Sequence, residues 1–144
     1  MRQAVAVDRE RVIRRYFDEL FGAGRVEILS ELLAEDYVNH SPGSAELART
    51  REGVAIVVAA LRAAFPDLRY TIEDMVVGDT AIAVRTVMTG THRGDFFGLP
   101  ATGRQVRVAQ MTIETFRESR IVAHHRVTDE LALMRQLGVV PGQG

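Results

Sequence analysis

The chain has 144 residues, close to the commonest size of a single domain and long enough to bury a sizeable core. Its hydrophobic share of 47% and charged share of 26% are ordinary for a folded globular protein and exclude a disordered or fibrous chain. The formal charge of -1 comes from 18 basic and 19 acidic residues spread along the sequence, so neither nucleic acid nor an anionic membrane is expected as a partner.

Two features that the sequence lacks bear on the cellular compartment of the protein. The sequence has no cysteine, which excludes disulfides and thiolate chemistry and fits a reducing cytoplasm. The apolar run 54–61 is too short to span a bilayer, and residues 1–8 lack the apolar core of a signal peptide. We therefore expect a cytoplasmic protein that forms one domain over residues 1–144, with its core at about 8–138.

Three helices are predicted in the first half of the chain. From Asp8, a possible N-cap, apolar residues recur at helical spacing up to residue 21. A shorter helix is predicted over 26–33, and a third runs over about 50–65, where a proline stops it. Between them, residues 36–44 are rich in turn formers and predict a short extended piece followed by a loop.

The second half of the chain is predicted to form strands. Beyond Leu68 the apolar residues no longer recur at helical spacing but at every second position. Short turns are expected at Gly78-Asp79 and Glu118-Ser119, and the apolar loop 94–103 is expected to cover a pocket or a dimer contact. A last short helix is expected to end at Gly138, before a frayed tail at 141–144. The predicted strands are 68–77, 81–91, 104–116 and 120–128, and the last helix is 130–137.

This order of elements places the chain in one fold class. Helices come first and an antiparallel meander second, without strand–helix–strand alternation and without internal repeats. The sequence therefore predicts an α+β fold whose helices are segregated on one face of the sheet.

Several short stretches, in this order and at this spacing, give the chain a specific family resemblance. They are Asp36-Tyr37-Val38-Asn39-His40, residues 61–67, residues 90–96, residues 99–103, and residues 121–125 leading to Asp129 and residues 136–138. With them the chain resembles the SnoaL-like polyketide cyclases, which belong to the superfamily of nuclear transport factor two, ketosteroid isomerase and limonene epoxide hydrolase. The resemblance covers nearly the whole chain, from about residue 8 to residue 138.

The resemblance implies both an architecture and a reaction. It implies a cone-shaped α+β barrel whose curved antiparallel sheet and N-terminal helices enclose one pocket, in a homodimer that packs sheet faces. It also implies ring closure of a small apolar carbonyl compound by intramolecular aldol chemistry, or its isomerisation, with no metal and no organic cofactor. The family places an acid/base aspartate at the position of Asp129 and usually has a tryptophan where this chain has His125.

Asp129 is the first candidate for a catalytic residue. On an ideal strand it shares a mainly apolar face with Ile121, Ala123, His125 and Val127. Desolvation on such a face would make the carboxylate a stronger base towards a carbon acid. The competing interpretation is that Asp129 only caps the helix that follows it. The same alternation places His125, rather than His124, beside Asp129 in the pocket.

Other polar residues are candidates for the walls of the pocket. Tyr37, Asn39 and His40 lie together at its expected mouth, where Asn39, His40 or His125 would steady an enolate. The competing interpretation is that Asn39 is a turn former and that Tyr37 packs in the core. Arg85 interrupts an apolar strand, so it should face the pocket, a carboxylate or a subunit interface, and the competing interpretation is a plain solvent-facing arginine. The remaining candidates for substrate contacts are Phe17, Met88, His92, Phe96 and Met111, although the pattern leaves open which face of strand 104–116 points inward.

Three functions remain open on these residues. The first is a cofactor-independent acid/base enzyme that acts on a carbonyl compound. The second is hydrolysis of an epoxide by water held between Asp129, Tyr37 and Asn39, against which stands Val87 where limonene epoxide hydrolase has a second aspartate. The third is a non-catalytic module for ligand binding or dimerisation. No metal site is expected, because the histidines lack a recognisable ligand spacing.

Overall fold

The computed structural model describes residues 2–42 and 46–140. Five strands and four α-helices make up the described part of the chain, together with short π and 3-10 helical turns. In chain order they are α1 (Arg2–Arg15), a π-helical turn (Tyr16–Phe21), a 3-10 turn (Val26–Ile28), α2 (Leu29–Leu32), β1 (Leu33–Asn39), a 3-10 turn (Glu46–Arg49), α3 (Arg51–Ala64), β2 (Arg69–Val77), β3 (Ala81–Thr91), β4 (Gln105–Arg117), β5 (Arg120–Thr128) and α4 (Glu130–Gln136).

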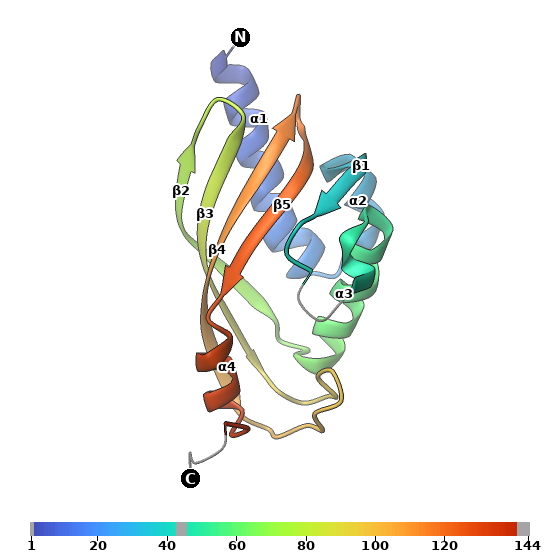
Figure 1. The fold of residues 1–144 in the computed structure, drawn as a ribbon, viewed down its shortest axis with the longest axis vertical. Coiled ribbons are helices and arrows are strands. Elements are labelled where there is room, and N and C mark those ends of the chain that lie inside the picture. The colour runs from blue at the N-terminus through green and yellow to red at the C-terminus, as the bar shows by residue number, and fades with distance from the viewer. Residues whose placement is uncertain (1, 43–45, 141–144) are drawn as a thin grey trace.

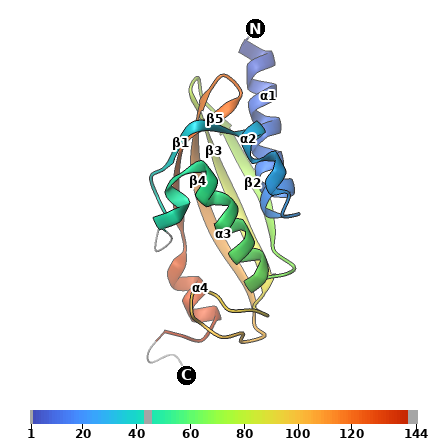
Figure 2. The ribbon, with the colours of Figure 1, turned by 90° about the vertical axis from the view of Figure 1, so that its right-hand side faces the viewer.

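The strands form one curled, open sheet in the order β1-β5-β4-β3-β2. Helices α1, α2 and α3 all lie against one face of this sheet, and α4 continues from the end of β5 towards the C-terminus (Figures 1 and 2). The predicted α+β class is confirmed. The prediction of a purely antiparallel sheet is wrong at one edge, because β1 pairs parallel with β5.

Helix α1 begins earlier than the sequence predicted. It starts at Arg2, so Asp8 lies inside the helix and caps nothing, because the alanines and valines before it allow a helix to continue. The buried aromatic end of the helix widens into a π-helical turn, in which the Gly22 N–H donates to the Phe17 carbonyl at 3.0 Å. The turn buries Tyr16, Phe17, Leu20 and Phe21 under the sheet.

Helix α3 has the boundaries that its end signals predict. The Thr50 hydroxyl accepts a hydrogen bond from the Gly53 N–H at 3.2 Å, and the helix ends immediately before Phe65 and Pro66. Just beyond it, the Asp67 carboxylate accepts hydrogen bonds from the Thr91 N–H at 2.7 Å and from the Thr91 hydroxyl at 2.8 Å. These bonds attach the end of α3 to the end of β3, so the helix is fixed across the inner face of the sheet.

A β-bulge in β5 decides which side chains of that strand point inward. Thr115 pairs with Ala123 but Phe116 pairs with Ile121, so Val122 is an extra residue on β5. One extra residue reverses the alternation of faces along the rest of a strand. His124 is consequently buried on the inner face, and His125 is exposed on the outer one.

Two short connections were predicted to within one residue. The β4–β5 hairpin turns at Glu118-Ser119 as expected, with Glu118 at a positive φ of 54°. The β2–β3 turn is centred one residue later than expected, because Val77 pairs with Ile82 and the Gly78 N–H donates to the Ala81 carbonyl. Part of the loop predicted over 36–44 and the frayed tail predicted at 141–144 lie outside the described residues.

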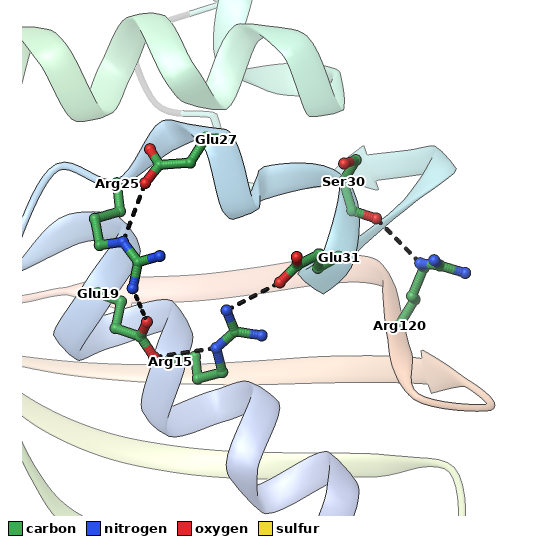
Figure 3. Close-up of polar contacts among 7 residues, drawn as sticks. All are labelled: Arg15, Glu19, Arg25, Glu27, Ser30, Glu31 and Arg120. Carbon is green, nitrogen blue, oxygen red and sulfur yellow. Dashed lines mark hydrogen bonds and ion pairs between the residues drawn. The ribbon is translucent and has the colours of Figure 1, made fainter.

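A network of ion pairs joins the end of α1 to the turns that follow it (Figure 3). Arg15 contacts Glu19 at 3.0 Å and Glu31 at 2.9 Å, while Arg25 contacts both Glu19 and Glu27. Pairs as exposed as these contribute roughly 0.2–1 kcal/mol each, so the buried aromatic turn does more to hold α1 in place. None of the described helices has the length and apolar character needed to cross a membrane.

Candidate functional site

A cavity of about 690 Å³ lies between the inner face of the sheet and the helices. The helical side is apolar and includes Phe17, Phe21 and Leu61. Residues 96–99 of the loop 94–103 form another part of the wall, as expected of an apolar loop that covers a pocket. A cavity of this size is within the range of roughly 300–1,000 Å³ that is typical of sites for small molecules.

The sheet carries a polar ladder, which we define as three cross-strand pairs between β4 and β5, and four of its six residues line the cavity: Gln110, His124, Arg126 and Thr128. Its rungs are Glu114–His124, Thr112–Arg126 and Gln110–Thr128. The β4 members of the ladder are buried, and their neighbours Met111 and Ile113 point outward. This settles which face of β4 points inward, and it is the polar one.

The innermost rung is a buried acid–histidine pair. Nδ1 of His124 lies 2.8 Å from each carboxylate oxygen of Glu114, and the two residues are 2% and 0% exposed. Because a carboxylate accepts hydrogen bonds, this contact assigns the ring proton to Nδ1. His124 itself lines the cavity, so Nε2 is the nitrogen that remains for a ligand.

Three buried tyrosines line the same cavity, and the charge of Glu114 acts on two of them, Tyr16 and Tyr37. Burial first, and then the charge of Glu114, raises the pKa of Tyr37 well above 10.0, while Arg126 lowers it in part. Burial also raises the pKa of Tyr16 well above its ordinary value and that of Tyr70 to about 12. The Tyr37 hydroxyl has no hydrogen-bond partner among the described residues, although it is buried and Tyr37 lines the cavity.

Arg126 forms the middle of the ladder and is half-buried on the cavity wall. One of its terminal nitrogens donates to the Ser41 carbonyl at 2.9 Å, and its backbone N–H donates to the Ser41 hydroxyl at 3.0 Å. The Ser41 N–H in turn donates to the Asn39 side-chain oxygen at 2.8 Å. The loop after β1 is thereby tied to β5, and Asn39 is held with its side chain buried at the cavity.

Five of the residues predicted from the sequence do lie at this cavity. The aromatic turn contributes Phe17, β1 contributes Tyr37 and Asn39, β3 contributes Met88, and the covering loop contributes Phe96. Apolar spacing and the likeness of motifs were sufficient to find them. Their placement at the cavity is established, and their roles remain proposals.

The predicted pocket positions of Asp129 and His125 are wrong. Asp129 is exposed, and its carboxylate accepts the Ala132 N–H at 3.1 Å as the N-cap of α4. The bulge turns His125 to the exposed surface, where its ring stacks on that of His40 with centroids 4.7 Å apart. His40 is therefore also outside the cavity. The desolvation expected for the Asp129 carboxylate does not occur, because strand alternation ends at the cap.

Three further candidates also lie away from the cavity wall. Arg85 and Met111 are exposed on the outer face of the sheet, because both alternate with inward-pointing neighbours. His92 is fully buried but does not line the cavity, and its Nδ1 accepts the Thr102 N–H at 3.2 Å. Within the described part of the chain, no group of three or more His, Cys, Asp or Glu is placed to hold a metal ion.

Sequence reasoning did not assign the residues of the polar ladder to the site. Gln110, Thr112 and Glu114 alternate with Met111, Ile113 and Thr115, so either face of β4 could have been the inner one. One signal was present in the sequence. His124, Arg126 and Thr128 repeat the same polar alternation on the partner strand, and two facing polar stripes indicate a polar site between helices and sheet.

Comparison with known proteins agrees with this architecture. The model of the SnoaL-like polyketide cyclase family matches residues 11–137. The aklanonic acid methyl ester cyclase DnrD of Streptomyces peucetius is 29% identical over 125 residues, which cover 83% of this chain and 84% of the relative.

Solved structures show the same fold. Wild-type IdmH of Streptomyces antibioticus is 36% identical, with a TM-score of 0.79 over 90% of this chain and 98% of that one. TsrD of Streptomyces laurentii, 24% identical, has a TM-score of 0.84 over 93% of this chain and 97% of that one. Because the family model spans most of the chain, the protein belongs to the SnoaL-like polyketide cyclase family.

Proposed function

We propose that this protein is an acid/base enzyme that closes a ring in a small apolar carbonyl compound by intramolecular aldol chemistry, without a metal or an organic cofactor. One observation carries the proposal. The buried Glu114–His124 pair presents a histidine to a cavity that is also lined by Tyr37, whose hydroxyl no described residue engages. A base and a hydrogen-bond donor that converge on one apolar space are the groups that enolate chemistry needs.

The proposed reaction uses each group in turn. Nε2 of neutral His124 takes a proton from the carbon next to a carbonyl, and Glu114 stabilises the imidazolium that forms. The Tyr37 hydroxyl donates a hydrogen bond to the enolate oxygen. The enolate carbon then attacks a second carbonyl of the same molecule, and the imidazolium returns its proton to the new alkoxide. Atoms and protons balance, because the product is an isomer of the substrate.

The surroundings of the two groups support these roles. The Tyr37 phenol is protonated at neutral pH and able to donate, since burial raises its pKa further above the ordinary value of 10.0. The apolar helical wall of the cavity lowers the local dielectric constant, which strengthens electrostatic interactions with a developing oxyanion. The curated relatives are named as cyclases of aklanonic acid methyl ester. We therefore expect a polyketide-type ester or acid that carries several carbonyl groups as the substrate.

A turnover assay with aklanonic acid methyl ester as the probe tests the proposal. We expect the wild-type protein to release a cyclised isomer. His124→Gln and Glu114→Gln should each lower the rate on the order of 10²-fold, the range of a lost general base. The matched control is His125→Gln, which changes an exposed histidine one residue away and should leave the rate unchanged.

Two results would contradict the proposal. If His124→Gln cyclised the probe as fast as the wild-type protein, His124 would not be the base. If the wild-type protein bound this ester and related polyketide carbonyl compounds tightly but returned them unchanged, a binding module would be the better description.

Asp129 is the base that the family resemblance implies, but in this structure it caps α4 outside the cavity, so the proposal assigns it no catalytic role. Asp129→Asn separates the two assignments, since asparagine also caps helices well and preserves the shape of the side chain. We expect this variant to keep most of its turnover. A loss as large as that of His124→Gln would move the base to Asp129.

We further propose that the protein works as a homodimer that packs the outer faces of its sheets. This face exposes large apolar side chains, among them Val127 at 76%, Val76 at 65% and Met111 at 61%. An antiparallel sheet with apolar residues on both faces needs something to cover its second face. The cavity lies on the opposite face, so dimer formation would leave it accessible.

A further inference from the structure

We propose that Arg126 forms an anion subsite inside the cavity and that the ligand of this protein carries a carboxylate. This inference depends on the proposed function only because both of them place the ligand in the same cavity. It adds the charge of the ligand, which the ring-closing chemistry does not specify.

The contacts of Arg126 leave most of its hydrogen-bonding capacity unused. A guanidinium has five N–H donors, and the described contact of this one is a single bond to the neutral Ser41 carbonyl at 2.9 Å. Arg126 nonetheless lies on the wall of a cavity whose opposite side is apolar. A half-buried cation with a neutral partner has lost hydration without gaining a counter-charge, and this favours an anionic ligand.

The carboxylates that face Arg126 do not neutralise it. Glu114 is bound through both oxygens to His124. Glu130 also lines the cavity, from the exposed start of α4. In the part of the chain that the structure describes, neither of them forms an ion pair with Arg126.

The position of Arg126 on β5 sets where the carboxylate would lie relative to the reacting carbon. Arg126 follows His124 by two residues on the same face of the strand, which corresponds to a separation of roughly 7 Å. The rung beyond it, Gln110–Thr128, is neutral and internally hydrogen-bonded at 3.0 Å. We therefore expect a ligand whose carboxylate contacts Arg126 while a carbonyl several bonds away reaches His124 and Tyr37.

A structural role is the competing explanation, because Arg126 also ties the loop after β1 to β5 through Ser41. The two explanations differ in a measurable way. An arginine that only supports the loop would not distinguish a charged ligand from its neutral ester, provided that the protein is folded. An anion subsite must distinguish them.

The test measures binding rather than turnover. We would titrate the protein with an anthraquinone carboxylic acid and with its methyl ester at neutral pH, by calorimetry. The wild-type protein should bind the acid about tenfold more tightly than the ester, as expected for a charge-assisted hydrogen bond on a partly solvated wall. Arg126→Gln should abolish this preference, and Arg126→Lys should retain part of it.

Two controls keep the result interpretable. Arg85→Gln removes an exposed arginine from the outer face of the sheet and should leave the preference intact. His124→Gln should also retain it, so the subsite can stand even if the proposed chemistry fails. Equal affinity of the wild-type protein for acid and ester would overturn the inference without the use of any variant. A preference that survived in folded Arg126→Gln would also overturn it.

Discussion

Glu114 and His124 face each other across β4 and β5, buried among aromatic residues. Neither can be removed alone without leaving a polar partner in an environment that water hardly reaches. Breaking one half of such a pair typically destabilises a protein by 3–5 kcal/mol, although replacing both halves together is often tolerated.

This asymmetry gives a prediction about stability. Glu114→Ala and His124→Ala should each lower the free energy of unfolding by about 3 kcal/mol, and the double variant should lose clearly less than the sum of the two. Urea denaturation of the four proteins measures the coupling. Strictly additive losses would show that the two side chains do not interact in the folded state.

The tyrosines give a second prediction at the residue scale, because all three in the chain are buried with raised pKa values. A raised folded-state pKa stabilises the protein fully below the ordinary value of 10.0, and this stabilisation is lost as the pH rises above it. Phenolate absorbance should therefore appear together with the loss of circular dichroism above about pH 10. Phenolates that formed while the fold persisted would contradict the burial.

At the scale of the elements, the ends of α3 and the apolar loop were predictable, whereas the start of α1 and the inner face of β5 were not. Thr50, Pro66 and the 94–103 loop act through local chemistry that the sequence displays directly. The bulge at Val122 depends on how two strands align, and it exchanges the roles of His124 and His125. Strand β1 was predicted only as a short extended piece within 36–44, and its pairing was missed because its parallel partner β5 lies far away in the sequence.

The N-cap residue of α4, Asp129, gives a prediction at the scale of the elements. Asp129→Ala should lower the free energy of unfolding by about 1 kcal/mol, since the Ala132 N–H loses its acceptor, whereas Asp129→Asn should be close to neutral. Thermal unfolding of the two variants checks this. Equal destabilisation by alanine and asparagine would mean that the carboxylate acts through its charge and not as a cap.

At the scale of the whole molecule, the sheet separates an inner face that carries the cavity from an outer face that exposes apolar side chains, for which we propose a role in association. The α+β class and the helical cover followed from the order of the elements. The size of the cavity and its polar ladder required the curvature and register of the assembled sheet, which residue spacing does not contain. The family resemblance predicted the pocket. It also placed Asp129 in the wall of that pocket, whereas in this structure Asp129 is the N-cap of α4.

The proposed dimer is tested by charging the outer face. Val127→Lys combined with Met111→Lys should shift the protein from dimer to monomer, because two cations would be buried at the interface. Analytical ultracentrifugation measures the change, and Ile56→Lys, on the exposed face of α3, is the matched control. A wild-type protein that sediments as a monomer at high concentration would refute the dimer.

Proton removal by His124 is the central claim, and hydrogen exchange on a bound carbonyl compound tests it most directly. Aklanonic acid methyl ester would be incubated with each protein in heavy water, and deuterium at the carbon next to its carbonyl would be followed by magnetic resonance. The wild-type protein and His125→Gln should exchange this proton much faster than buffer alone, and His124→Gln should fall towards the buffer rate. Exchange in His124→Gln as fast as in the wild-type protein would contradict the account.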